Sequence, residues 1–168
     1  MEKYVIAGFA GIGKTTLGKI RPEDVIDMEI RPYKYANYKK EYTLQEWYNM
    51  EHILNENFLP GYIEDVKKEI KEGTHKIIFV WLTVEVLEKL SEENIEFTVA
   101  TWNEEQEGIK DFLEDLYTKR GNPPHWRKKV LDFLEVINNY AKTNQIETIT
   151  LNKNENIQNK LKEMNLLK

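Results

Sequence analysis

The strongest constraint on the fold is a short segment near the start of the chain that fits the pattern G-x-x-x-x-G-K-[ST], namely Gly8-Phe9-Ala10-Gly11-Ile12-Gly13-Lys14-Thr15. Glycines at fixed places let a backbone curl so that its N–H groups point inward at phosphate oxygens. The lysine of this pattern neutralises the β and γ phosphates, and the hydroxyl after it reaches Mg²⁺. The segment therefore predicts a nucleotide-phosphate site between a β-strand and an α-helix.

The flanking sequence fits that unit. Residues 4–7 are a short apolar run that suits a buried parallel strand. Residues 16–20 continue as a helical turn, and the dipole of a helix N-terminus favours an anion. The alternative is a glycine-rich turn that only connects strand to helix. Pattern, position and flanks together favour phosphate binding.

Composition and charge limit the class of protein. The 168 residues, 40% hydrophobic and 11% aromatic, suit one folded domain with a sheet covered on both faces. A net charge of −5 argues against a general nucleic-acid-binding protein. The absence of cysteine excludes disulfides and thiolate metal sites. No stretch approaches a membrane span, and the chain enters a strand directly without a leader, so we expect a soluble, cytoplasmic protein with no membrane partner.

Apolar runs alternate with helical patterns along the chain, which is typical of βαβ units and a parallel sheet. Five strands are expected, at residues 4–7, 24–28, 76–82, 95–101 and 148–151. Helices are expected at residues 44–55, 62–71, 83–90, 104–119, 126–141 and 155–166. Pro60 and Gly61 are expected to end the first of these helices and to let the second begin.

Two acidic residues, Asp27 and Glu29, stand at the end of the second expected strand. The carboxyl ends of parallel strands converge on the ligand crevice, so acidic side chains there point toward bound phosphates. Residues two apart in an extended chain lie on the same side. One carboxylate suits hydrated Mg²⁺, and the other suits an acceptor hydroxyl as contact or base. An acidic strand end that only faces solvent is the alternative.

With these features the chain resembles the small P-loop kinases of the nucleoside monophosphate kinase and shikimate kinase group. The resemblance rests on the phosphate loop, the D-x-[DE] at Asp27 and a late basic segment, and it is greatest to nucleotide-kinase-like ATP-binding proteins of bacteriophages. It implies an α/β, three-layer P-loop NTPase fold over residues 1–168, with a five-stranded parallel sheet in the order 2-3-1-4-5. It also implies a helical acceptor insert at about residues 31–73, a mobile lid at about 118–129 and, for a phage protein, the host cytoplasm.

The resemblance assigns roles to individual residues. The residues that it places on the ATP phosphates are Gly8, Gly11, Ile12, Gly13, Lys14, Thr15 and Thr16. It makes Asp27 a Mg²⁺ or acceptor contact. From this resemblance, together with the loop pattern and the basic segment described below, we expect Thr15 and Asp27 to hold Mg²⁺, and Lys14, Asp27 and Arg120 to act in catalysis.

A basic segment at residues 118–129 inverts the local charge of an acidic chain, with cations at Lys119, Arg120, Arg127, Lys128 and Lys129. Such an inversion indicates an anionic partner. The planar fork of arginine contacts two phosphoryl oxygens, so Arg120 is the first candidate to bind the transferring group, and Arg127 is the second. The alternative is a solvated helix junction.

The segment after the second strand is rich in aromatic rings, at Tyr33, Tyr35, Tyr38, Tyr42, Trp47 and Tyr48. Aromatic rings stack on a base, and Arg31 or Lys34 suits an acceptor phosphate. The expected acceptor contacts are Asp27, Glu29, Arg31, Tyr35 and Arg127. The alternative is that the rings only pack the insert against the sheet.

The third strand is followed by Thr83, where many P-loop enzymes have an acidic residue for Mg²⁺, so Asp27 is expected to take that role. The histidines show no metal-binding spacing. We therefore expect an ATP- and Mg²⁺-dependent phosphotransferase that acts on a nucleotide, a nucleoside or a similar small acceptor, without a covalent intermediate. The second hypothesis is a nucleotide-gated binding module or NTPase that regulates a protein partner.

Overall fold

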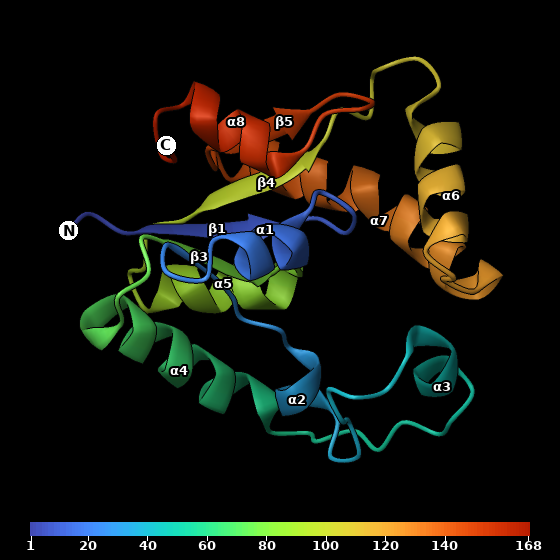
Figure 1. Ribbon diagram of the computed structural model, residues 1–168, viewed down its shortest axis with the longest axis horizontal. Helices are drawn as coiled ribbons and strands as arrows, with labels where there is room; N and C mark the ends of the chain where they lie inside the picture. The colour runs from blue at the N-terminus through green and yellow to red at the C-terminus, as the bar shows by residue number, and fades with distance from the viewer.

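A five-stranded, all-parallel β-sheet lies at the centre of the computed structural model, which describes residues 1–168 (Figure 1). In spatial order the strands are β2 (Val25–Asp27), β3 (Ile77–Trp81), β1 (Tyr4–Gly8), β4 (Thr98–Trp102) and β5 (Thr148–Leu151). Both β3 and β4 pair with β1, and Gly8 at its end stands beside Trp81 and Ala100. The predicted α/β class and the strand order 2-3-1-4-5 are confirmed.

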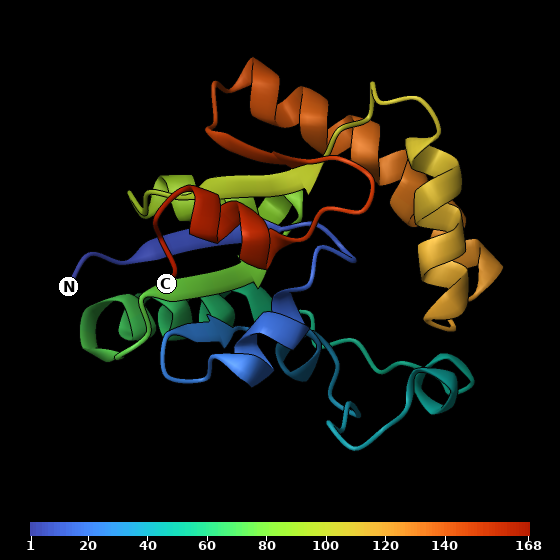
Figure 2. The same ribbon diagram turned by 45° about the horizontal axis from the view of Figure 1, so that its top comes forward.

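Helices cover both faces of the sheet, which explains why β1 and β3 are continuous apolar runs and why β4 is buried along almost its whole length. The helices are α1 (Lys14–Ile20), α2 (Arg31–Lys34), α3 (Leu44–Tyr48), α4 (Phe58–Glu72), α5 (Val84–Glu92), α6 (Ile109–Lys119), α7 (Pro124–Thr143) and α8 (Ile157–Glu163). Figures 1 and 2 show α1 and α8 on one face and α4, α5 and α7 on the other. None of these helices has both the length and the apolar character needed to cross a membrane.

The insert between β2 and β3 departs most from the expected elements. One helix was expected at residues 44–55, but α3 ends at Tyr48. Its start is fixed by a capping box, in which Thr43 and Glu46 bond each other's backbone N–H. The chain then returns to pair Leu54 with Tyr35 in an antiparallel bridge. This return explains why α3 ends early, because the chain after Tyr48 forms backbone contacts with the segment around Tyr35 and does not continue the helix.

The predicted break at residues 60–61 is also wrong, since both residues lie in the first turn of α4. Proline is tolerated there because the N–H groups of a first helical turn have no intrahelical partner. The largest other shifts are in β4, which begins at Thr98 and not at residue 95, and in α6, which begins at Ile109 and not at residue 104. Before α6, the chain turns through Gly108, whose φ of 75° is left-handed.

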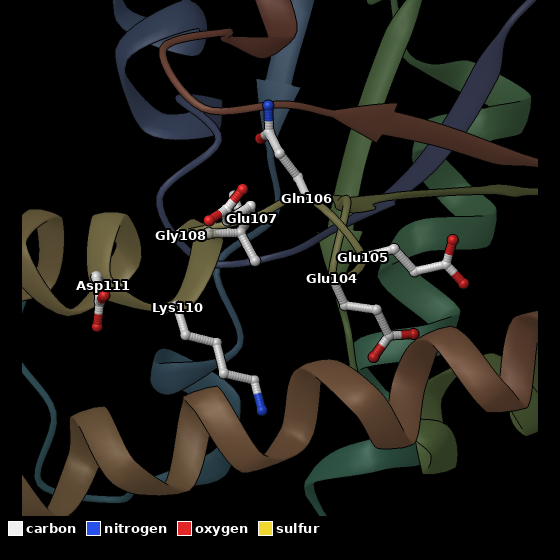
Figure 3. Close-up of a pocket in the computed structure, with 8 residues that line it drawn as sticks. Glu104, Glu105, Gln106, Glu107, Gly108, Lys110 and Asp111 are labelled. Carbon is white, nitrogen blue, oxygen red and sulfur yellow. The ribbon is translucent and has the colours of Figure 1, made fainter.

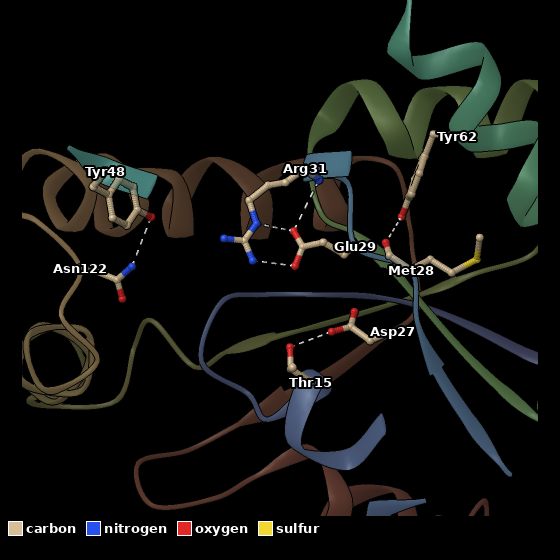
Figure 4. Close-up of polar contacts among 8 residues, drawn as sticks. All are labelled: Thr15, Asp27, Met28, Glu29, Arg31, Tyr48, Tyr62 and Asn122. Atoms are coloured by element: carbon tan, nitrogen blue, oxygen red, sulfur yellow. Dashed lines mark hydrogen bonds and ion pairs between the residues drawn. The ribbon is translucent and has the colours of Figure 1, made fainter. Parts of the chain in front are cut away.

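A buried tyrosine joins the ends of the two strands nearest the insert. The hydroxyl of Tyr62 in α4 donates to the Met28 carbonyl at 2.7 Å (Figure 4). It also accepts from the Trp81 N–H at 2.9 Å. Met28 follows β2 directly, and Trp81 is the last residue of β3. Burial raises the pKa of Tyr62, so its O–H stays protonated. This side chain therefore fixes the strand end that carries Asp27.

We expect Tyr62→Phe to lower the free energy of unfolding by about 1–3 kcal/mol, because it leaves the N–H of Trp81 and the carbonyl of Met28 buried without partners. The matched control is Tyr33→Phe, which removes the exposed hydrogen bond from Tyr33 to Asp65 and should change the unfolding free energy by less than about 1 kcal/mol. Urea unfolding followed by circular dichroism measures both. Equal effects of the two substitutions would contradict this role of Tyr62.

Candidate functional site

The glycine loop, residues 8–13 between β1 and the start of α1, has a backbone conformation that favours glycine at two positions. The φ angles of Gly11 and Gly13 are 84° and 103°, in the left-handed region. A Cβ on Gly11 would also lie 2.9 Å from Leu116 Cδ2. The spacing of the glycines thus reflects the curl of the loop and its close packing under α6.

Side chains from other elements hold the carbonyl groups of this loop. The Ala10 carbonyl accepts from the Tyr117 hydroxyl at 2.8 Å and from Trp102 Nε1 at 3.1 Å. The Ile12 carbonyl accepts from the Ile157 N–H, at the start of α8, at 2.9 Å. Three distant elements, β4, α6 and α8, therefore fix the loop before any ligand binds.

Lys14, the first residue of α1, folds back over the loop. Its Nζ donates to the Gly8 carbonyl at 2.5 Å and to the Phe9 carbonyl at 2.9 Å. Burial lowers the pKa of Lys14 to about 8, with the positive charge of Arg120 acting in the same direction and the carboxylate of Asp27 opposing it. A desolvated ammonium group held at the loop is suited to an anion, because an anion would restore the lost stabilisation of its charge.

Thr15 and Asp27 form the next pair along the cleft. The Thr15 hydroxyl donates to Asp27 Oδ2 at 2.8 Å (Figure 4). Burial raises the pKa of Asp27, against the opposing effect of Lys14. A hydroxyl and a carboxylate oxygen are ligands that Mg²⁺ accepts. No group of three or more His, Asp or Glu side chains is arranged as a metal site. The pair therefore fits a Mg²⁺ that takes its other ligands from water and phosphate, as this ion usually does.

Glu29 and Arg31 form an ion pair just beyond Asp27. Glu29 Oε1 accepts from Arg31 Nε at 2.7 Å, and Oε2 accepts from Nη2 at 2.9 Å (Figure 4). Both side chains remain about a quarter exposed, at 28% and 27%. Two parallel hydrogen bonds fix the guanidinium plane and leave its third nitrogen, Nη1, without a protein acceptor.

One cleft of about 800 Å³ connects these groups. It is lined by part of the glycine loop, the end of β2, the insert and the turn between α6 and α7. Its cations are Lys14, Lys19, Arg31, Lys34, Arg120 and Lys129, and its carboxylates are Asp27 and Glu29. The cleft is thus locally basic, although the chain carries a net charge of −5. Such an inversion of charge favours an anionic ligand.

Most of the residues predicted from the sequence line this cleft. They are Gly11, Gly13, Lys14, Thr15, Thr16, Asp27, Glu29, Arg31, Tyr35 and Arg120. Gly8 and Ile12 do not. A Cβ on Gly8 would lie 2.6 Å from Lys14 Cδ, and the Ile12 side chain is fully buried. These two residues therefore shape the loop from behind.

Arg127 was predicted to contact the acceptor, but its side chain is bound to other parts of the protein. Its Nε donates to Glu114 Oε1 at 2.6 Å, and its Nη1 donates to the Asn122 carbonyl at 2.6 Å. These bonds tie α6 to the turn before α7, and the side chain does not line the cleft. The expectation that Arg127 contacts an acceptor is corrected accordingly, because Glu114 and Asn122 bind its Nε and Nη1 and the side chain lies outside the cleft.

The aromatic residues of the insert pack around Trp47, which is 3% exposed yet outside the main hydrophobic core. His52 stacks on its ring with centroids 3.7 Å apart, and three tyrosines pack around it, namely Tyr35, Tyr38 and Tyr42. The insert thus has a hydrophobic nucleus of its own, and these rings do not pack it against the sheet. Tyr38 and Tyr42 do not line the cleft, whereas Tyr35, Trp47 and His52 do.

Several residues that line the cleft were not predicted as site residues, among them His52, Asn122 and His125. Tyr48 and Lys129, which the sequence placed in the aromatic cluster and in the basic segment, line it as well. The Tyr48 hydroxyl accepts from Asn122 Nδ2 at 3.3 Å, so the insert and the α6–α7 turn meet across the cleft (Figure 4). The position of Asn122 two residues after Arg120 is the one sequence signal for this contact.

A second hollow, of about 340 Å³, is lined by residues 104–111. Its carboxylates belong to Glu104, Glu105, Glu107 and Asp111, and they point in different directions in Figure 3. Their negative charge opposes phosphate binding, and no metal-binding cluster is formed. The basic cleft is therefore the candidate site.

Comparisons with known proteins bear on the fold alone. No protein-family model matches the chain. No curated protein matches it either. Among solved structures, the chain is similar to an uncharacterized protein from Eubacterium ventriosum, with a TM-score of 0.50 and 11% sequence identity. The similarity covers 98% of this chain and 97% of that chain, so the two share their overall architecture.

We expect the affinity of the cleft for sulfate to fall as the pH rises above about 8. The ammonium group of Lys14 loses its proton near this pH, because burial lowers its pKa to about 8, and a neutral amine no longer attracts an anion. The charge of sulfate does not change in this pH range, so a change in affinity must come from the titration of a group on the protein. Calorimetric titration at several pH values measures it, with Lys14→Met as control. The same decline in both proteins would contradict the assignment to Lys14.

Proposed function

We propose that this protein is an ATP- and Mg²⁺-dependent phosphotransferase that acts on a small acceptor. The observation that carries the proposal is the basic cleft, which has the glycine loop on one wall and the polar residues of the insert on another. Phosphoryl transfer needs a donor and an acceptor held together with their negative charge neutralised. A nucleotide or nucleoside remains the favoured acceptor class.

The glycine loop, Lys14 and Thr15 are the proposed donor side. Backbone N–H groups of a curled loop and a lysine ammonium group bind phosphate oxygens. ATP with Mg²⁺ supplies the transferable γ-phosphoryl group. Thr15 and Asp27 are the residues that would hold the metal, since their oxygens already lie 2.8 Å apart. With no acidic residue after β3, Asp27 is the nearest protein carboxylate to this hydroxyl.

Glu29 and Arg120 are proposed to act on the acceptor and on the transferring group. Glu29 is held in place by Arg31, so one of its oxygens is oriented as a hydrogen-bond acceptor for an incoming hydroxyl. Arg120 lines the cleft, with its guanidinium over the ring of Tyr117 at 5.8 Å and its Nη1 3.6 Å from the position of a Cβ on Gly11. No hydrogen bond or ion pair uses its nitrogen donors, which are therefore free to bind phosphoryl oxygens. Binding and orientation, without a covalent intermediate, are sufficient for this reaction.

A nucleotide-gated binding module is the second candidate function. It is favoured by the residues after β3, where Trp81 lines the cleft and Thr83 uses its hydroxyl to cap α5. Without a carboxylate here, the metal is held by fewer protein oxygens, which favours slow turnover. In that case the nucleotide would control how a partner protein binds to the insert.

The deciding experiment measures binding and turnover separately. ATP with Mg²⁺ should raise the melting temperature of the unsubstituted protein, because the folded state binds the ligand and the unfolded state does not. It should not raise that of Lys14→Ala, which lacks the ammonium group that binds the phosphates. A panel of nucleotides, nucleosides and small metabolites is then assayed for release of ADP that depends on the acceptor. ATP binding without any turnover, together with nucleotide-dependent capture of a protein, would favour the binding module instead.

Arg120→Ala should lower kcat by roughly 10³-fold, because it removes a planar charge from the transferring phosphoryl group. Lys119→Ala is the matched control: this neighbouring side chain is 74% exposed and pairs with Asp115, outside the cleft. Its kcat should stay close to that of the native protein. Steady-state kinetics and melting temperatures are compared for both variants. A similar loss in the two variants would show that Arg120 has no specific role.

A further inference from the structure

The carbonyl of Ala10 in the glycine loop is held by two side chains that are far from it in the sequence. The Tyr117 hydroxyl in α6 donates to this carbonyl at 2.8 Å, and Trp102 Nε1 at the end of β4 donates to it at 3.1 Å. Both donors are buried, with exposed fractions of 0% and 1%. Burial raises the pKa of Tyr117, so its hydroxyl keeps the hydrogen that it donates. The direction of the carbonyl is therefore fixed from inside the protein.

The direction of this carbonyl also sets the direction of the N–H that follows it. The peptide bond between Ala10 and Gly11 is trans and planar, so the Gly11 N–H points away from the two donors. This N–H has no hydrogen-bond partner in the protein, and Gly11 lines the cleft. A free N–H in a curled loop is a donor for a phosphate oxygen. Tyr117 and Trp102 do not line the cleft themselves, so they can act on a ligand only through this peptide.

The same end of α6 packs directly on Gly11. A Cβ on this glycine would lie 2.9 Å from Leu116 Cδ2, 3.0 Å from Tyr117 Cε1 and 3.6 Å from Arg120 Nη1. Residues three apart share one face of a helix, and the guanidinium of Arg120 lies over the ring of Tyr117 at 5.8 Å. The other contact of this ring is with Trp126 in α7, edge-on at 5.1 Å. The Tyr117 side chain thus joins the loop to the arginine that is proposed to bind the transferring group.

We propose that Tyr117 is a positioning residue for phosphoryl transfer. Its hydroxyl turns the peptide between Ala10 and Gly11 so that the N–H faces a donor phosphate, and its ring supports Arg120 beside the same part of the loop. This inference rests on the proposed function and adds to it a residue that does not contact the nucleotide. Binding of the donor phosphate and the placement of Arg120 then depend on one side chain at the end of α6.

The hydroxyl and the ring of Tyr117 have separate roles, which substitutions can distinguish. Tyr117→Phe removes the hydroxyl and keeps the ring. The Ala10 carbonyl still accepts from Trp102 in this variant, so no buried carbonyl is left without a partner and the protein should fold. With one donor in place of two, the peptide is held less firmly, and a phosphate that binds the Gly11 N–H must order it first. Loss of the hydroxyl should therefore weaken binding of the donor.

The first test measures binding and does not depend on turnover. Calorimetric titration with sulfate is compared for the unsubstituted protein, Tyr117→Phe and the control Tyr140→Phe. Tyr140 lies in α7, outside the cleft, and its hydroxyl forms no hydrogen bond. Tyr117→Phe should weaken sulfate binding about tenfold, as expected when one hydrogen bond to a charged group is weakened, and Tyr140→Phe should not change it. Equal affinity for sulfate in all three proteins would overturn the proposal.

The second test uses steady-state kinetics. Tyr117→Phe should raise the KM for ATP about tenfold and leave kcat within about twofold, because its ring still supports Arg120. Tyr117→Leu, which removes the ring as well, should also lower kcat. A purely structural role would lower the melting temperature without separating KM from kcat in this way. A lower kcat with an unchanged KM for ATP in Tyr117→Phe would contradict the role of the hydroxyl.

The two tests separate this inference from the proposed function. If sulfate binding depends on the Tyr117 hydroxyl but the protein phosphorylates no acceptor, the proposed function fails and the role of Tyr117 at the loop stands. If Tyr117→Phe does not fold, Trp102→Phe removes the other donor to the Ala10 carbonyl and should weaken sulfate binding by the same mechanism. Unchanged sulfate affinity in that variant would overturn the proposal.

Discussion

The cleft depends on hydrogen bonds that keep the glycine loop in shape. The Ala10 carbonyl is held by Tyr117 and Trp102, and that of Ile12 is held by the first residue of α8. Buried carbonyl groups without such partners would destabilise the folded state. Because the donors come from β4, α6 and α8, the loop is fixed only when the whole sheet and its helices are assembled. The positions of Lys14 and Thr15 follow from that assembly.

The opposite wall of the cleft is built in a different way. The part of the insert before α4 packs around Trp47, which lies outside the main core, and it contacts α4 through the edge-on rings of Tyr33 and Tyr62, 5.1 Å apart. A second contact, between Tyr48 and Asn122, joins the insert to the α6–α7 turn. A wall with its own packed nucleus keeps its shape as a unit. The cleft therefore lies between two packed bodies, and its unpaired cations face the space between them.

Much of the fold could be predicted from local patterns. The apolar runs of the strands alternate with helical segments, and in the structure they form the expected five-stranded parallel sheet. The errors fall where tertiary contacts override such patterns. The helix expected at residues 44–55 ends at Tyr48, because the chain returns to pair Leu54 with Tyr35. Pro60 did not break a helix, because a first helical turn needs no N–H at that position.

The sequence by itself determined the glycine loop and the acidic end of β2, because each depends on residue types at fixed short spacing. Only the tertiary structure decided which other side chains join them. Arg120 and Arg127 belong to the same basic segment, yet Arg120 lines the cleft while Glu114 binds Arg127. Tyr48 and Asn122 meet although they are far apart in the chain. Which side chains line the cleft depends on how helices and loops pack across the sheet, so it cannot be predicted from local residue spacing.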